Sequence, residues 1–279
     1  MPTNRTDYLA SMYSLEGQVA IVTGGTGVLG GAMAKALAIA GARVGVLGRS
    51  RERAERIASE LEAVGGDAMA LTADVLDRDA LESARDMVVG RWGSITTLVN
   101  AAGGNIAAAT IPERGDVFGM SAAAFQEVVD LNLTGTLLPS LVFGRAMAEA
   151  GNGSIVNISS MASPRALTRN AGYGAAKSAV DNLTRWLAVE LGTRYGGKIR
   201  VNAIAPGFFV GEQNRRLLLE PDGNPTARGR AVIAHTPLGR FGEADELMGA
   251  LVWLCSPSAR FVTGIVVPVD GGFSAFGGV

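Results

Sequence analysis

The stretch Val19-Ala-Ile-Val-Thr-Gly-Gly-Thr-Gly-Val-Leu-Gly-Gly31 decides the fold, because an apolar run of strand length leads through a glycine-rich turn directly into a helical pattern. Such a turn between a first strand and a first helix lets the backbone approach a pyrophosphate, whose charge the helix N-terminus then stabilises. Many α/β proteins use glycine at this place only for tight packing. The turn is therefore a candidate dinucleotide site that needs support from other motifs.

Six more apolar runs of about five residues follow, separated by helix-length amphipathic stretches and without a composition break that would indicate a linker. This alternation is typical of βαβ units, and strands without strict polar–apolar alternation indicate a sheet covered by helices on both faces. The sequence predicts an α/β fold: a single doubly wound Rossmann domain, 1–279, with a seven-stranded parallel sheet. The predicted strands are 19–23, 43–47, 67–71, 95–99, 154–158, 199–204 and 265–269, and the predicted helices are 36–42, 51–66, 76–92, 121–150 and 174–195.

Composition and charge exclude several classes of protein. The 279 residues carry 25 Lys and Arg against 26 Asp and Glu, so no basic face is available for nucleic acid or an anionic membrane. With a single His and a single Cys, Cys255, the chain has no internal disulfide and no usual zinc ligand set. The first residues, with Asp7, lack the apolar run of a signal peptide, and no later stretch has the length of a membrane span. We expect a cytoplasmic, metal-independent protein.

The end of the second predicted strand indicates which dinucleotide is bound. No acidic residue lies between Gln18 and Arg51, although a carboxylate at this place usually binds the adenosine ribose. Arg49 follows the strand instead, and a guanidinium suits a 2′-phosphate, which favours NADP(H) over NAD(H). The alternative is that Arg49, Arg51 and Arg53 only form the solvated start of a helix.

Other candidate cofactor contacts lie at the carboxyl ends of the strands, where open α/β sheets bind ligands. Asp74 follows the third strand and can accept a hydrogen bond from adenine; equally, it can cap the next helix. The candidate cofactor-binding residues are Gly24, Thr26, Gly27, Val28, Leu29, Gly30, Arg49, Asp74, Val75, Asn100, Ala101, Gly103, Tyr173, Lys177, Pro206 and Gly207.

Tyr173 and Lys177 are four residues apart in a predicted helix, so both point to one side. A phenol is a poor acid–base catalyst at neutral pH, but a cation beside it favours the phenolate and moves its pKa toward the working range. Ser160 follows the fifth strand, where its hydroxyl can bond a substrate oxygen. Asn132 lies within a helical pattern, where Asn often marks a bend or a polar contact, and a water held there can relay a proton.

The glycine-rich turn, Asn100-Ala-Ala-Gly103, Asn132, Ser160, the Tyr173/Lys177 pair and Pro206-Gly207 occur in an order that resembles the short-chain dehydrogenase/reductase family over essentially the whole sequence. The resemblance implies a catalytic tetrad of Asn132, Ser160, Tyr173 and Lys177, hydride transfer between nicotinamide and a carbonyl or carbinol carbon, and a homotetramer packed through helices 121–150 and 174–195. Two positions depart from the family pattern, Val28 in place of a glycine and Ala101 in place of an asparagine.

The excursion at about 208–237, between the sixth strand and the last helix, matches the family's helical substrate lid. Its Gln213, Asn214, Arg215 and Arg216 suit a polyhydroxy carboxylate, because Arg binds carboxylates bidentately and amides suit hydroxyls. Either arginine can equally belong to a solvated helix face. The candidate substrate-binding residues are Asn105, Ser160, Met161, Arg169, Gln213, Asn214 and Arg215, whereas the lone His235 is expected to make only a loop hydrogen bond.

With this lid and turn, the sequence resembles the family's D-mannonate oxidoreductase (fructuronate reductase) subgroup, which implies D-fructuronate and D-mannonate as substrates. Alternatives are another substrate, such as a keto-gluconate, another sugar or a 3-oxoacyl thioester, and a binding protein that uses the dinucleotide without chemistry. The tail from Phe273 to Val279 extends past the last strand. Its two phenylalanines either cover a neighbouring subunit's pocket or form a surface strap.

Overall fold

A computed structural model describes residues 5–112, 115–211 and 214–278 of the protein. Seven parallel strands form one sheet, in the order β3-β2-β1-β4-β5-β6-β7. The strand order reverses between β1 and β4, and this switch point is where open α/β sheets bind ligands. The strands are β1 (Val19–Thr23), β2 (Arg43–Gly48), β3 (Ala68–Thr72), β4 (Thr97–Asn100), β5 (Gly153–Ile158), β6 (Ile199–Pro206) and β7 (Val266–Val269). Each predicted strand is confirmed to within two residues.

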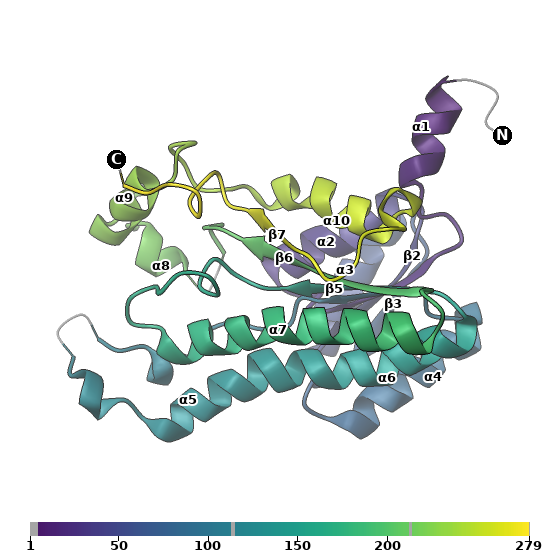
Figure 1. Ribbon diagram of the computed structural model, residues 1–279, viewed down its shortest axis with the longest axis horizontal. Helices are drawn as coiled ribbons and strands as arrows, with labels where there is room; N and C mark the ends of the chain where they lie inside the picture. Colours follow the sequence, from purple (N-terminus) through teal and green to yellow (C-terminus); the bar gives the residue numbers. More distant parts are fainter. Residues whose placement is uncertain (1–4, 113–114, 212–213, 279) are drawn as a thin grey trace.

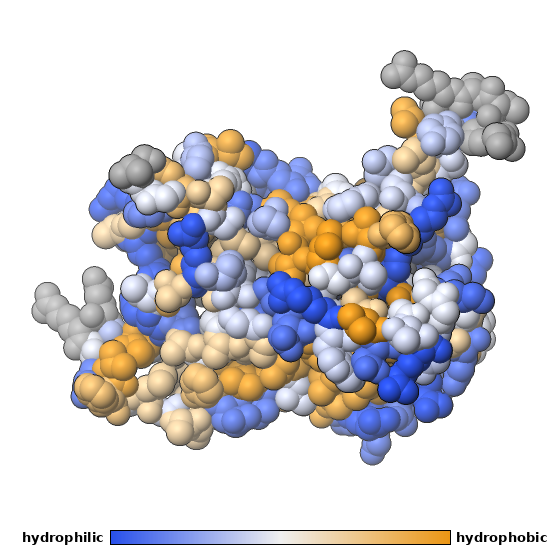
Figure 2. Space-filling view, in the orientation of Figure 1, coloured by the Kyte–Doolittle hydropathy of each residue, from blue (hydrophilic) through white to orange (hydrophobic). Residues whose placement is uncertain are grey.

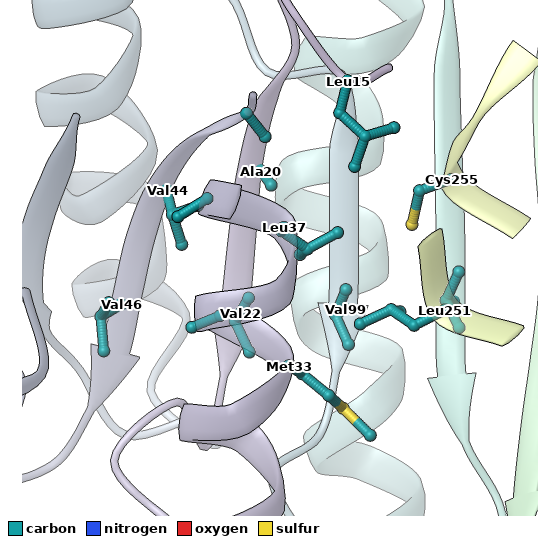
Figure 3. Packing of buried hydrophobic residues seen from close by; sticks show 14 of the residues in the cluster. Leu15, Ala20, Val22, Met33, Leu37, Val44, Val46, Val99, Leu251 and Cys255 are labelled. Atoms are coloured by element: carbon teal, nitrogen blue, oxygen red, sulfur yellow. The ribbon is translucent and has the colours of Figure 1, made fainter. Parts of the chain in front are cut away.

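Helices cover both faces of the sheet, as predicted (Figure 1). On one face lie α2 (Val28–Ile39), α3 (Arg51–Ala63) and α10 (Met248–Cys255), and on the other α4 (Arg78–Trp92), α6 (Gly135–Ala150) and α7 (Ala171–Arg194). Figure 3 shows that apolar side chains of α2, of the sheet and of α10 pack together in one cluster; the packed residues include Val22, Met33, Leu37, Val44, Val99, Leu251 and Cys255.

The first crossover helix differs from the prediction at both ends. We expected a helix at 36–42, but α2 begins at Val28, immediately after the glycine turn, and ends at Ile39. Glycines lower helix propensity and so hid the first two turns from the pattern. The helix stops because the chain turns at Gly41, whose φ of +102° is a left-handed conformation that glycine adopts without strain.

The predicted helix 121–150 is two helices joined by a π-helical turn. The segment α5 (Ala122–Val129) leads into η3 (Asp130–Thr134), and α6 follows without a break in direction. Asn132 lies inside the π turn, so the expected irregularity at this residue is confirmed. Such turns are frequent at functional sites because the wider turn displaces backbone and side-chain groups from the helical ladder.

The lid segment, 208–237, contains the short helix α8 (Arg215–Leu218) and α9 (Ala227–Ala234). It lies beyond the carboxyl ends of β6 and β7, at the left of Figure 1. A helix near the N-terminus, α1 (Arg5–Tyr13), was not predicted and projects from the body at the upper right. The remaining short helical turns are η1 (Ala107–Ala109), η2 (Val117–Gly119), η4 (Ala244–Leu247) and η5 (Pro257–Ala259).

The tail after β7 folds back on the lid segment of its own chain. The ring of Phe273 meets that of Phe208 edge-on, with centroids 5.2 Å apart, and Phe276 lies against His235. Arg165 donates a hydrogen bond to the carbonyl oxygen of Ser274. These contacts match the alternative in which the tail is a surface strap. No helix in the described part of the protein is long and apolar enough to cross a membrane.

Candidate active site

The glycine-rich turn packs tightly against the loop that follows β4. A Cβ atom on Gly24 would lie 2.7 Å from the backbone of Ala102, and one on Gly30 would lie 2.2 Å from the carbonyl oxygen of Gly24. Gly24 also has a φ of +64°. The turn therefore requires glycine at these two positions for the close approach of backbone to backbone.

The N-terminus of α2 has the features of an anion site. Gly27 precedes the helix in an extended conformation, and no side chain caps the first turn. The free N–H groups and the helix dipole suit the pyrophosphate of a dinucleotide. Val28 occupies the first helical position with 47% of its surface exposed, so its side chain is accommodated at the rim of the turn. The residues present fit a bound dinucleotide.

The adenosine side of this site lies at the ends of β2 and β3. Arg49 is exposed, and Ser50 caps α3 by accepting a hydrogen bond from Arg53 N at 3.3 Å. Asp74 accepts a hydrogen bond from Leu76 N at 2.9 Å. The alternative in which Asp74 caps the next helix is wrong: the cap of α4 is Asp77, three residues later, because helix α4 begins only at Arg78.

The other predicted cofactor residues surround the same edge of the sheet. Thr26 lies against Gly48 at the end of β2, Leu29 and Ala101 pack on the core, and Val75 is buried. Pro206 ends β6, and a Cβ on Gly207 would lie 2.7 Å from Asp270 Cα. The structure thus brings the candidates from β1, β4 and β6 to one end of the sheet.

Asn100 and Gly103 connect this turn to the reacting groups. The buried Nδ2 of Asn100 donates to Ser140 Oγ and Asn157 Oδ1, both at 2.9 Å, which ties β4 to α6 and β5. A Cβ on Gly103 would lie 2.7 Å from Asn132 Oδ1 and 3.3 Å from Lys177 Nζ. Glycine at 103 therefore gives the Asn132 amide and the Lys177 ammonium room beside the loop.

The fully buried side chain of Asn132 holds that loop from the π turn. Its Nδ2 donates to Gly104 O at 2.7 Å and to Val128 O at 2.8 Å, and its Oδ1 accepts from Gly104 N at 3.0 Å. The Asn132 carbonyl oxygen accepts a hydrogen bond from Thr136 Oγ1 at 2.8 Å. The amide thus clamps both backbone groups of Gly104 and fixes the loop beside Lys177.

Ser160 and Tyr173 are hydrogen-bonded to each other. Ser160 lies two residues beyond β5, where its Oγ also accepts from Ala162 N at 3.1 Å, and Tyr173 is in the first turn of α7. Burial raises the pKa of Tyr173 above its ordinary value, and the hydrogen bond with Ser160 partly offsets this. The net lowering of the Tyr173 pKa that we expected from Lys177 is not seen, because burial dominates.

Lys177 is almost fully buried, and its Nζ lies 5.6 Å from the Tyr173 ring centre. The ammonium donates to Ile158 O at 2.7 Å. Burial lowers the pKa of Lys177 to about 8, while the negative charge of Asp181 opposes this shift. The pKa of Lys177 thus remains above neutral pH, where the ammonium is the main form.

Asp181 is a member of this site that the sequence reasoning missed. It lies one helical turn after Lys177 in α7, and its carboxylate accepts hydrogen bonds from Ser159 Oγ and Ser163 Oγ, on either side of Ser160. The signal available in the sequence was the spacing of four residues from Lys177, which places both on one helix face.

The predicted substrate residues divide into two groups. Asn105, Met161 and Arg169 lie near the tetrad: Asn105 donates to Asn170 Oδ1 at 2.9 Å, Met161 is buried, and Arg169 donates to Ile111 O at 2.7 Å. In the lid segment, Asn214 uses its side chain locally, accepting from Gly211 N and donating to Phe209 O, both at 2.8 Å. Arg215 and Arg216 are exposed on α8, and Gln213 lies outside the described residues. His235 bonds Ala231 O at 3.0 Å, the loop contact expected of it.

The chain is similar over almost its whole length to known oxidoreductases. The sequence profile described as "Enoyl-(Acyl carrier protein) reductase" matches residues 26–274. An oxidoreductase of Bacillus subtilis, "Uncharacterized oxidoreductase UxuB", is 44% identical over 95% of this chain and 98% of its own length. The protein belongs to the short-chain dehydrogenase/reductase family.

Two solved structures of family members carry nicotinamide dinucleotides. A provisionally named D-mannonate oxidoreductase from Haemophilus influenza, with bound NAD, has 40% sequence identity and a TM-score of 0.89, covering 97% of this chain and all of the other. A gluconate 5-dehydrogenase from Burkholderia cenocepacia, in complex with NADP and tartrate, has 32% identity and a TM-score of 0.85, covering 96% and 99% of the two chains. This short-chain dehydrogenase/reductase is an NAD(P)-dependent oxidoreductase that acts on CH–OH groups.

Proposed function

We propose that this oxidoreductase interconverts the carbonyl and carbinol forms of a sugar acid, with D-fructuronate and D-mannonate as the pair. The observation that carries the proposal is the full-length 40% identity to a structure named, provisionally, as a D-mannonate oxidoreductase. Arg169 and Asn170 lie at the start of α7, four residues or fewer before Tyr173, and Asn105 donates a hydrogen bond to Asn170. These polar and cationic side chains support a hydroxylated, anionic substrate.

Tyr173 transfers the proton in the proposed mechanism. The nicotinamide of the bound dinucleotide supplies or accepts the hydride. The Ser160 hydroxyl, hydrogen-bonded to Tyr173, orients the substrate oxygen toward the phenol. Lys177 places its charge beside the phenol and favours the phenolate once the proton has left. Asn132 fixes the loop at Gly104, and the neighbouring Gly103 leaves room for the Asn132 amide and the Lys177 ammonium.

Arg49 is the basis of a proposed preference for NADP(H). It follows β2 directly and is exposed, and no carboxylate occupies the strand end where a ribose diol is usually bound. A guanidinium at this place can bind a 2′-phosphate bidentately. Of the two related structures, one binds NAD and the other binds NADP, so both dinucleotides occur among relatives of this protein.

Initial rates with D-fructuronate and either NADH or NADPH test the proposed substrate and the proposed cofactor preference together. The readout is the loss of reduced nicotinamide. Turnover that is faster with NADPH is the expected result, and the Tyr173→Phe variant is the control for the site. Binding of a dinucleotide without turnover of D-fructuronate contradicts the hexuronate proposal.

Gluconate-type substrates are the second candidate, because the relative that binds NADP and tartrate is a gluconate 5-dehydrogenase. Oxidation of D-gluconate, measured against oxidation of D-mannonate under the same conditions, decides between the two. A 3-oxoacyl thioester is the third candidate, and turnover of such a thioester that is faster than turnover of both sugar acids favours it.

A cytoplasmic homotetramer is the proposed assembly. Large apolar side chains are exposed on the two long helices, Leu141 on α6 and Trp186 and Val189 on α7. Figure 2 shows a second apolar area over α10 and the loop before β7, where Phe261 and Ile265 are exposed. Two separate apolar areas suit an assembly with two kinds of interface. Light scattering that gives four times the 28.7 kDa of one subunit is the expected result.

A further inference from the structure

Arg169 has a backbone conformation that is unusual for its residue type. Its φ of +77° makes it the one non-glycine residue with a left-handed conformation in 5–112, 115–211 and 214–278. Such conformations persist where surrounding contacts hold them, and they gather at functional sites. Here the contacts are two hydrogen bonds with Ile111: Arg169 O accepts from Ile111 N at 3.0 Å, and Arg169 Nε donates to Ile111 O at 2.7 Å. The guanidinium is thereby fixed, and its two terminal nitrogens have no partner among the described residues.

A second arginine reaches the same place from the lid segment. Arg228 is in α9, and its Nη1 donates to Thr168 Oγ1 at 3.2 Å, one residue before Arg169. Burial lowers the pKa of Arg228, and the positive charge of Arg169 lowers it further. The two cations are therefore close enough to repel each other across the junction of lid and α7.

No carboxylate among the described residues neutralises this pair. Within residues 5–112, 115–211 and 214–278, eight other arginines lie within 4.0 Å of a carboxylate oxygen, but neither Arg169 nor Arg228 does. Both side chains are partly buried, so water screens their repulsion less than at an open surface. Two neighbouring guanidinium groups with unused donors form a site for a carboxylate, which accepts several of these hydrogen bonds at once.

The pair lies beside the proposed reaction centre. Arg169 is four residues before Tyr173, and Asn170 between them accepts the hydrogen bond from Asn105 Nδ2. The other polar atom of the Asn105 amide, Oδ1, is buried and has no hydrogen-bond partner among the described residues. A substrate hydroxyl donating to this oxygen would satisfy it. The Asn105 acceptor and both cations are thus held at residues 168–170, directly before the first turn of α7, which contains Tyr173.

We propose that Arg169 and Arg228 form a two-arginine clamp for the carboxylate of the substrate, and that Arg228 sets the preference for sugar acids over neutral polyols. The clamp rests on the proposed function, because it presumes that Tyr173 acts on a sugar acid. Arg169 was among the substrate-binding residues predicted from the sequence, whereas Arg228 was not; the predicted Arg215 is exposed on α8.

The test uses the full-length protein with saturating oxidised cofactor and the variants Arg228→Ala, Arg228→Lys and Arg169→Asn, since asparagine tolerates a left-handed backbone. Arg230→Ala is the matched control: it removes the same charge two residues away in α9, where Arg230 is exposed and bonds Pro225 O at 2.8 Å. Calorimetry measures the Kd of tartrate, a small hydroxylated carboxylate, and of the cofactor. Initial rates compare oxidation of D-mannonate with that of D-mannitol, the neutral polyol with the same carbon skeleton.

The expected result is a Kd for tartrate and a KM for D-mannonate raised about tenfold or more by Arg228→Ala, with partial recovery in Arg228→Lys and no change in Arg230→Ala. The Kd of the cofactor and the KM for D-mannitol should not move, which separates lost carboxylate binding from a disturbed fold. If wild-type protein binds tartrate in this arginine-dependent way but does not oxidise D-mannonate, the clamp stands and the hexuronate assignment fails. Tartrate binding that is absent, or equal in all variants, overturns the clamp.

Discussion

The Lys177 ammonium lies 5.6 Å from the centre of the Tyr173 ring and donates its hydrogen bond to Ile158 O instead of to the phenol. Lys177 thus acts on Tyr173 through its charge, and its own position is set by the end of β5. The Tyr173 hydroxyl is left to Ser160 and to a substrate oxygen.

Removal of this hydroxyl should abolish turnover without loss of the cofactor. In Tyr173→Phe the ring still packs against the cluster of Ala109, Ala124 and Val128, but no proton can be transferred. We expect kcat to fall by at least about a hundredfold while the cofactor Kd, measured by fluorescence titration, stays within about twofold. An equal loss of turnover and cofactor binding would contradict the assigned role.

Asp181→Asn should move the alkaline limit of activity to lower pH. The carboxylate favours the charged form of Lys177, whose pKa is already lowered to about 8 by burial, so its removal lowers that pKa further. If charged Lys177 is needed, the alkaline limb of kcat shifts down by on the order of one pH unit. Ser163→Ala is the control, because it removes one hydrogen bond to Asp181 but no charge. The alkaline limb of kcat should therefore stay at the same pH in this variant. If Asp181→Asn lowers kcat equally at every pH and the alkaline limb does not move, then Asp181 has a structural role only.

Lys177 should also make the free energy of unfolding depend on pH, and the direction of this dependence follows from its pKa. Its pKa is about 8 in the folded protein and 10.5 when unperturbed, so between these pH values the unfolded protein binds more protons. The contribution of this group to the free energy of unfolding therefore rises with pH from about 8 to about 10.5. Comparison of urea unfolding for wild type and Lys177→Met across this window checks the sign, because only wild type carries the dependence.

The strands were predictable because each one is a short apolar run rich in Val and Ile, as in β1 and β5, and such a run is recognised from the local sequence alone. The start of α2 was not predictable from the sequence. Its first turn contains Gly27 and Gly30, which have low helix propensity but lie close to the Gly24 carbonyl oxygen, where a Cβ atom on Gly30 would be too near. Helix α1 has no apolar face of the periodic kind that identifies amphipathic helices.

The site was predictable where spacing along one element decides it, as for Tyr173 and Lys177 in α7. It was not predictable where a contact joins distant segments. Arg228 meets Thr168 across 60 residues, and the Ser159 and Ser163 hydroxyls meet Asp181 from the loop after β5. The raised pKa of Tyr173 has the same origin, because burial by other elements outweighs the hydrogen bond with Ser160.

Two glycine substitutions should change stability in opposite directions. Gly30→Ala places a Cβ 2.2 Å from Gly24 O, so the turn must shift; we expect about 1–3 kcal/mol of destabilisation and weaker cofactor binding. Gly90 is exposed within α4, and a Cβ there meets no atom within 4 Å. Gly90→Ala should therefore stabilise the protein by up to about 1 kcal/mol through helix propensity. Thermal unfolding with and without cofactor separates the two effects.

Arg49→Ala should alter the choice of cofactor and leave the fold intact. The exposed guanidinium follows β2, and loss of a charge-assisted contact with a 2′-phosphate corresponds to about a ten- to hundredfold higher KM for NADPH. The KM for NADH should be unchanged, because NADH lacks this phosphate. Arg56→Ala, which removes an exposed arginine paired at 3.8 Å with Glu60 in α3, is the matched control and should change neither value. If Arg49→Ala raises both KM values together, or neither, then Arg49 belongs to the solvated start of α3, and the lack of an acidic residue at the end of β2 alone governs which dinucleotide is accepted.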